Sequence, residues 1–376
     1  MSLSTQELAR YSRHLSLNEF GIAGQEKLKA AKVLVVGAGG LGSPSLLYLA
    51  AAGVGAIGIV DFDKVDISNL QRQVLFTADD VGQSKSVMAA KRLTALNSLI
   101  KVTAHDVELN ASNVMSILSN YDIVIDGCDR FATRYLVNDA CVLLRKPLVS
   151  AAIHRFEGQA FTYIPGQGPC YRCLFPEQPA GDLVPNCATA GVLGVLPGIL
   201  GTIQATEAIK LITGLGSVLN GRLLTYDALD MRFAEFEFSR RHDCAVCGDA
   251  PTITTPIEQS AACASPSDEA GITTAELQML LTGLVAADLQ LIDVRDPHEF
   301  AVGHLPQSIN IPLSTLDSQV HLLNRNRRIV FVCRSGMRSQ QACAIAAQVG
   351  IFNTANVSGG LQQWNQTVDS TLHCPL

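Results

Sequence analysis

The sequence predicts an α/β protein in two parts: a doubly wound, mostly parallel sheet with an antiparallel continuation, and then a smaller α/β domain. Three observations support this. An apolar run at residues 32–36 leads into the glycine-rich stretch VVGAGGLGS, followed by a helical pattern and a second apolar run. Beyond residue 148 the segments become β-rich, and several of them alternate apolar with polar residues. Residues 251–271 are rich in Pro, Ser, Thr and Ala and precede a second α/β pattern.

In the first part, strands and helices alternate as in a Rossmann-like fold. Ser4-Thr5-Gln6-Glu7 predicts a capping box at the start of a helix that carries Arg13. Apolar runs and helical spacing then predict buried strands at 32–36, 56–61, 101–106 and 123–126 and helices at 43–52 and 84–97. Further on, the patterns predict a buried helix at 196–213, β-rich segments at 158–164, 223–227 and 232–239, and a hairpin turn at Asn220-Gly221.

The second part has its own short pattern, with strands at 289–294 and 328–333 and a helix at 340–349. We therefore divide the chain into a first domain at 1–250, a linker at 251–270 and a second domain at 271–376.

The composition excludes several classes of protein. A net charge of −6 argues against a nucleic-acid-binding surface. The start, MSLSTQELAR, has neither a basic lead nor an apolar core, so we expect no signal peptide. The longest apolar run, at 46–60, is short and interrupted by three glycines, so it does not span a bilayer. We expect a cytoplasmic protein with neither nucleic acid nor membrane as partner, whose eleven cysteines are mostly reduced.

The glycine-rich stretch predicts a nucleotide site. Gly37, Gly39 and Gly42 fit G-x-G-x-x-G, a loop whose amides approach phosphate at the start of a helix. Asp61 ends the next strand, at the distance expected for a carboxylate that binds ribose hydroxyls. These residues fit a NAD-dependent oxidoreductase as well as an ATP-dependent enzyme.

The next segment favours ATP. A dehydrogenase does not need Asn69, Arg72 and Lys85 after its ribose carboxylate. A triphosphate under attack does need fixed cations where charge develops on the leaving pyrophosphate. Asp129 follows the strand at 123–126, where open α/β sheets bind ligands, and its carboxylate could hold magnesium. Taken singly, Arg72 and Lys85 would be interpreted as surface charges and Asp129 as a loop residue; the set of three is what favours ATP.

The motifs GAGGLG, DFDKVDISNLQRQ, VGQSK and GCDR resemble the adenylating enzymes related to ubiquitin-activating enzymes. The nearest branch contains the molybdopterin-synthase and thiamine-biosynthesis adenylyltransferases. The resemblance implies the adenylating enzyme fold over about residues 7–248, a homodimer, and an Arg13 that reaches the partner subunit's ATP. It also implies a set of ATP-site residues: Gly37, Gly39, Gly40, Gly42, Asp61, Ser68, Asn69, Leu70, Gln71, Arg72, Lys85, Asp129 and Arg130.

Two cysteine pairs predict a zinc site. Cys170 and Cys173 form one C-x-x-C and Cys244 and Cys247 form another. Four thiolates that meet in space make the tetrahedral set of a closed structural zinc site. A redox motif or buried small hydrophobes fit less well, because we expect neither pair to open a helix. The family that the sequence resembles has the same tetrad.

Cys187 lies in a Gly/Pro-rich segment and has no partner cysteine at metal spacing. In related activating enzymes a cysteine at this place accepts the carrier protein as a thioester or acyl disulfide. A simple buried cysteine is the alternative.

The second domain resembles a rhodanese domain. LIDVRD, followed by EF and GH, is similar to the entry motif of that family, and Cys333-Arg334-Ser335-Gly336-Met337-Arg338-Ser339 lies after an apolar strand and before a helix. Successive amides of such a loop make an anion cradle and predict a reactive thiolate. Four residues separate Cys333 from Arg338, one fewer than in the protein phosphatases, so the pocket suits sulfur better than phosphate. We interpret Cys333 as a persulfide carrier; a rhodanese-like module that only binds partners is the alternative.

Together, these resemblances imply the type of activating enzyme that serves molybdenum-cofactor synthesis and tRNA thiolation. The C-terminal glycine of a small ubiquitin-like sulfur carrier ending in Gly-Gly would attack the α-phosphate of ATP. The persulfide on Cys333, loaded by a donor such as a cysteine desulfurase, would attack the acyl-adenylate, and reduction involving Cys187 would leave a thiocarboxylate. Arg13, Arg72 and Lys85 would stabilise the first transition state. The cofactors implied are ATP, magnesium and zinc. A scaffold that gathers sulfur carriers and donors without catalysis is a further alternative.

Overall fold

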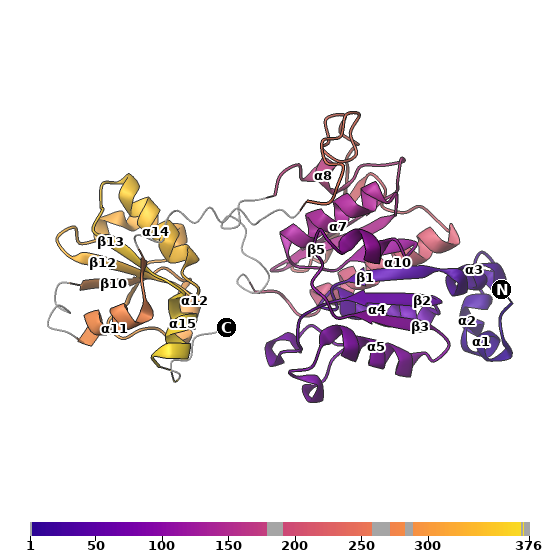
Figure 1. The fold of residues 1–376 in the computed structure, drawn as a ribbon, viewed down its shortest axis with the longest axis horizontal. Coiled ribbons are helices and arrows are strands. Elements are labelled where there is room, and N and C mark those ends of the chain that lie inside the picture. Colours follow the sequence, from indigo (N-terminus) through magenta and orange to yellow (C-terminus); the bar gives the residue numbers. More distant parts are fainter. Residues whose placement is uncertain (1, 179–190, 258–270, 283–288, 370, 372–376) are drawn as a thin grey trace. The chain divides into compact units, whose positions relative to one another are not determined.

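The computed structural model describes residues 2–178, 191–257, 271–282, 289–369 and 371. The chain forms two compact units, residues 1–262 and 263–376 (Figure 1). Among the described residues, no helix is long and apolar enough to cross a membrane.

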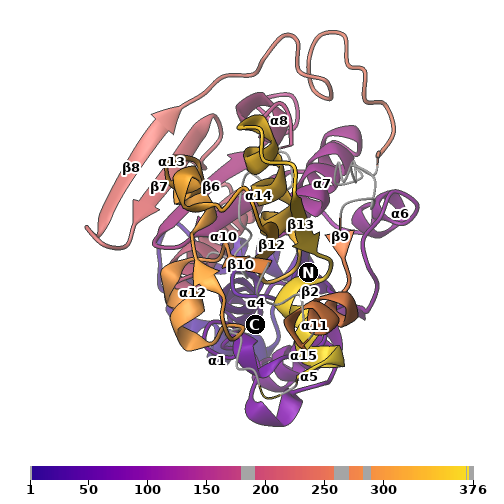
Figure 2. The ribbon, with the colours of Figure 1, turned by 90° about the vertical axis from the view of Figure 1, so that its left-hand side faces the viewer.

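The first unit is built on an eight-stranded sheet of order β3-β2-β1-β4-β5-β6-β7-β8. The five strands from β3 to β5 are parallel, and the strands from β5 to β8 are antiparallel. Figure 2 shows β6, β7 and β8 side by side at one edge. The strands are β1 (Lys32–Val36), β2 (Ala56–Val60), β3 (Lys101–His105), β4 (Ile123–Asp126), β5 (Leu148–His154), β6 (Glu157–Tyr163), β7 (Arg222–Asp227) and β8 (Arg232–Glu237).

Helices cover both faces of this sheet. They are α1 (Thr5–Arg10), α2 (Ser12–Leu15), α3 (Gly21–Ala30), α4 (Gly42–Ala52), α5 (Lys85–Leu96), α6 (Val114–Leu118), α7 (Phe131–Leu143), α8 (Tyr171–Leu174) and α10 (Leu196–Thr213), with short 3₁₀ turns η1 (Ile67–Asn69) and η2 (Ala78–Asp80). The predicted capping box at Ser4 and Glu7 is present at α1. The single helix expected there is divided at Tyr11 into α1 and α2.

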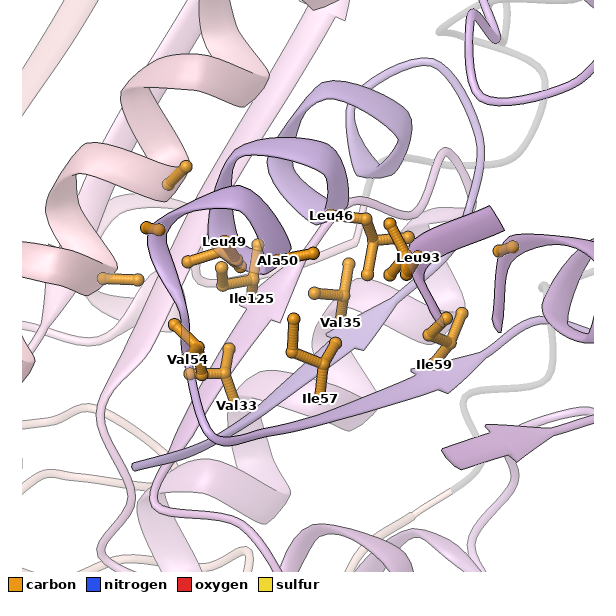
Figure 3. Close-up of a cluster of buried hydrophobic side chains, with 14 of the residues drawn as sticks. Val33, Val35, Leu46, Leu49, Ala50, Val54, Ile57, Ile59, Leu93 and Ile125 are labelled. Atoms are coloured by element: carbon orange, nitrogen blue, oxygen red, sulfur yellow. The ribbon is translucent and has the colours of Figure 1, made fainter. Parts of the chain in front are cut away.

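Strand β1 explains why the sheet carries two cores. Val33 and Val35 point into a cluster with α4 and α5, which Figure 3 shows around Leu46 and Leu93. Leu34 and Val36 point to the other face, where they pack with residues of α6 and α7. Because side chains alternate along a strand, a strand covered on both faces reads as one continuous apolar run. The predicted α/β fold class is confirmed.

One predicted turn was wrong. Asn220-Gly221 precedes β7 and joins no hairpin, although Gly221 has a positive φ of 71°. The hairpins of the described residues lie elsewhere: Arg155-Phe156 connects β5 to β6, and residues 228–231 connect β7 to β8. Arg155 takes a φ of 53°, a conformation that favours Gly or Asn, so the sequence carried no turn signal there.

The second unit has a five-stranded sheet of order β11-β10-β12-β13-β9 in which every pair is parallel. Its strands are β9 (Gly271–Ile272), β10 (Leu289–Asp293), β11 (Ile309–Asn310), β12 (Arg328–Val332) and β13 (Thr354–Val357). Its helices are α11 (Thr274–Thr282), α12 (Pro297–Val302), α13 (Leu313–Gln319), η5 (Val320–Leu322), α14 (Met337–Gln348) and α15 (Gly360–Thr367). Two apolar clusters flank this sheet, one on each face.

Candidate active sites

The glycine loop joins β1 to α4 and needs glycine at two positions. Gly37 has a φ of 91°, and a Cβ there would lie 3.0 Å from the carbonyl oxygen of Gly127 after β4. A Cβ on Gly42 would lie 1.9 Å from the carbonyl oxygen of Gly37. The loop therefore folds tightly back on itself and against the end of β4, and α4 begins at its last glycine, Gly42.

A cavity of about 650 Å³ opens at this edge. One part is lined by the glycine loop and by the residues after β2 and β4. The other part is lined by the antiparallel strands β5, β6, β7 and β8. The cavity thus extends from the parallel half of the sheet into the antiparallel half, which gives room for a second group beside a nucleotide.

Asp61 directly follows β2 and is a buried carboxylate with fixed partners. Its Oδ2 accepts the backbone N–H of Ala38 at 2.7 Å, and its Oδ1 accepts the backbone N–H of Asp63 at 2.9 Å. Burial raises the pKa of Asp61 above its ordinary value, while the positive charge of Lys85 opposes that shift. The carboxylate is thereby held in place as an acceptor on the wall of the cavity.

Two cations face the same space. Lys85 begins α5, its side chain is buried, and its Nζ lies 3.2 Å from Oδ2 of Asp63. Arg72 is half-buried on the cavity wall and donates from Nη1 to the carbonyl oxygen of Ser68 at 3.2 Å. A buried ammonium paired with a half-exposed carboxylate retains attraction for a further anion, so both side chains are placed to meet phosphate groups.

Asp129 and Arg130 follow β4 on the exposed rim of the cavity. Arg130 donates to Oε1 of Glu108 at 3.0 Å, and its guanidinium lies 4.8 Å from the centre of the Phe62 ring. A single carboxylate such as Asp129, together with phosphate oxygens, is the oxygen donor set in which proteins hold magnesium. The residues present therefore fit that ion.

The four cysteines of the two pairs form one cluster. The Sγ–Sγ distances are 4.0 Å for Cys170–Cys173, 3.6 Å for Cys170–Cys244 and 3.4 Å for Cys173–Cys247, and all four sulfurs lie within 4.8 Å of one another. Ligands about 2.3 Å from a tetrahedral zinc ion are about 3.8 Å apart, so the donor set fits zinc. One expectation was wrong: Cys170 does open a short helix, α8. The zinc interpretation does not depend on that expectation, because it rests on the four sulfurs lying close together.

In the second unit, Cys333 lies between β12 and α14 and is only 1% exposed. Its sulfur accepts the backbone N–H of Gly336 at 3.1 Å and that of Ser339 at 3.4 Å. Gly336 has a φ of 98°, and a Cβ there would lie 3.1 Å from the carbonyl oxygen of Val357. The turn requires glycine, and its amides point at sulfur as an anion cradle does.

A partly buried ion pair ties the cysteine loop to α12, and a buried one lies within the entry motif. Arg338 donates to both carboxylate oxygens of Glu299, at 2.6 and 2.9 Å. In the entry motif, Arg295 is 1% exposed and donates to Asp293 and to the carbonyl oxygen of Gly303. The arginine that ends the loop is therefore tied to α12, and its role is to fix the loop as well as to supply charge.

Comparison with known proteins places these features. Residues 11–246 match the ThiF family, and residues 275–367 match the rhodanese-like domain. The chain belongs to the ThiF family. It is 46% identical to the probable adenylyltransferase/sulfurtransferase MoeZ of Mycobacterium tuberculosis, over 96% of this chain and 94% of that protein. It is 42% identical to the adenylyltransferase and sulfurtransferase MOCS3 of Aedes aegypti, over 98% of this chain and 89% of that protein.

Solved structures agree with this assignment. The Escherichia coli enzyme MccB in its complex with ATP is 26% identical, with a TM-score of 0.56, over 65% of this chain and 75% of that one. The chain is thus an adenylyltransferase and sulfurtransferase with a ThiF domain and a rhodanese-like domain, and the nucleotide it binds is ATP. The oxidoreductase and scaffold alternatives are set aside.

The structure places the predicted ATP-site residues of the ThiF domain in two groups. Those that line the cavity are Gly37, Gly39, Gly40, Asp61, Arg72, Lys85, Asp129 and Arg130. Gly42 begins α4 and does not line the cavity. The cavity lining also omits the residues in or next to η1: Ser68, Asn69, Leu70 and Gln71. Arg13 is exposed on α2, also away from the lining, and Cys187 lies outside the described residues.

Sequence reasoning missed several residues of the cavity wall. Gln73 is buried, and its Oε1 has no hydrogen-bond partner in the structure as described. Arg134 comes from α7, Tyr171 and Phe175 come from α8 and its C-terminal end, and others come from the antiparallel strands. Gln73 is the last residue of the motif DFDKVDISNLQRQ, so its place in the chain was a usable signal. The others depend on how distant segments pack.

Proposed function

We propose that the ThiF domain adenylates the C-terminal glycine of a small ubiquitin-like sulfur carrier ending in Gly-Gly, and that the rhodanese-like domain then supplies sulfur to it. The observation that carries this proposal is the pairing, in one chain, of a cavity with fixed cations and a cysteine cradled by amides. The first suits attack on a triphosphate, and the second suits an anionic sulfur.

In the first step, a carboxylate oxygen of the carrier's terminal glycine attacks the α-phosphate, and pyrophosphate leaves. Lys85 and Arg72 attract the phosphates, and the Asp61 carboxylate accepts hydrogen bonds from ribose. We propose that Asp129 holds magnesium, which when bound neutralises charge on the phosphate oxygens. We propose that the extended tail of the carrier enters the part of the cavity that the antiparallel strands line.

In the second step, a persulfide on Cys333 attacks the carbonyl carbon of the acyl-adenylate, and AMP leaves. The product is an acyl disulfide between the carrier and Cys333. A second thiol, for which we propose Cys187, attacks the Cys333 sulfur of this disulfide and releases the carrier as a thiocarboxylate. The resulting Cys187–Cys333 disulfide is then reduced by a cellular dithiol.

The remaining assignments follow the same reasoning. We propose that zinc occupies the four-cysteine cluster, because its sulfur spacing suits a tetrahedral ion. We propose a homodimer in which Arg13 reaches the partner subunit's ATP, a persulfide donor such as a cysteine desulfurase, and a reducing compartment such as the cytoplasm, where these thiols persist. Residues 1–250 then carry adenylation and residues 271–376 carry sulfur.

The test is the intact mass of a candidate carrier ending in Gly-Gly after incubation with this protein, Mg-ATP and thiosulfate. We expect a mass gain equal to the difference between sulfur and oxygen. Retained AMP without sulfur would support adenylation and contradict the role of the rhodanese-like domain. Neither product with several carriers would contradict both steps.

A further inference from the structure

Arg134 is a buried cation in the wall of the adenylation cavity. It lies on the first turn of α7, and its side chain is only 7% exposed. Its Nη2 donates to the carbonyl oxygens of Cys128 at 2.8 Å and of Ala151 at 3.1 Å. Its Nε lies 3.1 Å from Oδ2 of Asp126. One guanidinium thus joins α7, β5 and the segment that follows β4.

Its carboxylate partner holds the same segment from the other side. Asp126 ends β4 and is fully buried. Its Oδ1 accepts the backbone N–H of Cys128 at 3.1 Å and the thiol of Cys128 at 2.7 Å, and its Oδ2 accepts the hydroxyl of Ser150 at 2.9 Å. Both backbone polar groups of Cys128 are therefore bound by one buried ion pair.

The next residue along the chain is Asp129. Residues 127–130 have no regular secondary structure, so nothing in a helix or strand fixes the direction in which Asp129 leaves the sheet. The Asp126–Arg134 pair supplies that constraint at the preceding residue. A buried ion pair is weak evidence for a contribution to stability, because desolvation offsets most of the attraction. It is a strong geometric constraint all the same, since each of its hydrogen bonds has a required direction.

Arg134 also faces the zinc-cysteine turn. Its guanidinium lies 5.8 Å from the centre of the Tyr171 ring, and Tyr171 stands between the two cysteines of the first pair. Tyr171 lines the cavity as well. The cation is enclosed on this side by an aromatic face, which limits the positions that it can take.

We infer that Arg134 is a positioning residue for adenylation: acting with Asp126, it fixes the backbone at Cys128 and so fixes where the Asp129 carboxylate can hold magnesium beside the phosphates of ATP. This inference rests on the proposed function, which assigns magnesium to Asp129. Groups that orient a metal ligand through hydrogen bonds typically change metal affinity by about 10- to 100-fold when they are replaced.

The test compares Arg134→Lys with a matched control, Arg172→Lys. Lysine keeps the positive charge but lacks the planar fork that donates to Cys128 and Ala151 while it lies against the Asp126 carboxylate. Arg172 is also buried and donates to both oxygens of a buried Asp139, each at 2.7 Å, yet it does not line the cavity. Both variants disturb a buried arginine–aspartate pair, and only one of them touches Cys128.

The first readout is equilibrium binding of a non-hydrolysable ATP analogue, by calorimetry, with magnesium and with a chelator. We expect Arg134→Lys to lower, by about 10-fold, the ratio of the affinity with magnesium to the affinity in chelator. Arg172→Lys should keep the wild-type ratio. If both variants keep the wild-type ratio, or if both lose it equally, Arg134 is a structural residue and the inference is wrong.

The second readout is a double-mutant cycle with Asp129→Ala. If Arg134 acts through Asp129, the double variant has the same magnesium dependence as Asp129→Ala alone. Losses that multiply would overturn the inference while leaving the magnesium role of Asp129 intact. If Asp129→Ala alone keeps the wild-type magnesium dependence, the proposed function of Asp129 fails instead, and the inference fails with it.

A second variant guards against poor folding of Arg134→Lys. The pair Asp126→Asn with Arg134→Met removes both charges together, so no uncompensated charge stays buried. Asparagine can still accept the Cys128 N–H, but the donor to the Cys128 carbonyl oxygen is lost. We expect the same loss of magnesium dependence with a melting temperature near that of the wild type. A folded double variant with wild-type magnesium dependence would refute the positioning role.

Discussion

Replacing Cys247 by serine should remove the metal from the cysteine cluster and loosen the first unit. Cys247 and Cys173 are 74 residues apart in the chain, with their sulfurs 3.4 Å apart. A cross-link that closes a loop of this length lowers the free energy of folding by about 4 kcal/mol through the entropy of the unfolded chain. That is a large share of the roughly 5–15 kcal/mol by which domains are stable. For a domain of this size it corresponds to a melting temperature lower by on the order of 10 °C.

The assay pairs zinc content, by mass spectrometry, with thermal unfolding of the full chain. The control is Cys343→Ser, which changes a half-buried cysteine on α14 of the other unit and should keep both zinc and the first unit's transition. A Cys247→Ser protein with one zinc per chain and an unchanged transition would refute the reasoning. So would a wild-type protein that contains two disulfides and no metal.

Three further predictions test the two active sites. Cys333→Ala should keep adenylation, measured as pyrophosphate release with the carrier, and should lose sulfur transfer, whereas thiocarboxylate formation by this variant would contradict the persulfide role. Gly42→Ala places a Cβ 1.9 Å from the Gly37 carbonyl oxygen; we expect at least about 1–3 kcal/mol of destabilisation, with weaker binding of ATP by calorimetry, and normal binding would contradict the tight-loop geometry. Glu299→Gln tests the pKa of Glu299. Burial raises this pKa, but the hydrogen bonds and charge of Arg338 lower it by more, so that it lies below 4.5. Because this pKa is lower in the folded state, the charged Glu299 stabilises the fold above pH 4.5, and that stabilisation is lost as the pH falls through the folded-state pKa. The difference in melting temperature between the wild type and Glu299→Gln should therefore shrink on acidification below pH 4.5. A constant difference would show that Glu299 stays uncharged or unpaired.

The parallel half of the first sheet could be predicted because each buried strand is covered on both faces. β1, β2 and β4 are continuous apolar runs in the sequence for this reason, and glycine or aspartate marks where each one ends. Those ends carry residues for which we propose ATP binding, so finding the strands also located Asp61 and Asp129 on the cavity wall. The glycine pattern reflects backbone segments that pass too close together to leave space for a Cβ, as at Gly37 and Gly42.

The antiparallel half was harder to predict because its pairing depends on long connections. β6 pairs with β7, which follows α8 and α10 in the chain, so no local turn sets that register. The tight turn between β5 and β6 uses Arg155 in a left-handed conformation, which sequence statistics assign to glycine or asparagine. The residues that these strands place in the cavity were therefore missed.

Buried polar networks were the other gap. Arg134 looks in the sequence like a surface cation on the first turn of a helix, and only the burial of Asp126 below it reveals its part in the site. The same holds for Arg172 and Asp139. A charge in a sequence gives no sign of whether its partner is water or a buried carboxylate, because that depends on which elements cover it.

The two active sites stabilise negative charge by different means, and the difference follows from the size of the charge. At the cysteine loop, the sulfur of Cys333 is met by two backbone amides, while Arg338 is already bound to Glu299. Amides suffice for a single anionic sulfur, and they require only a short turn. A triphosphate carries several charges that shift during the reaction, so its site needs full cations from several elements. Under the proposed function, that requirement accounts for Lys85 and Arg72 reaching one cavity from different segments, and for a buried ion pair holding the segment before Asp129.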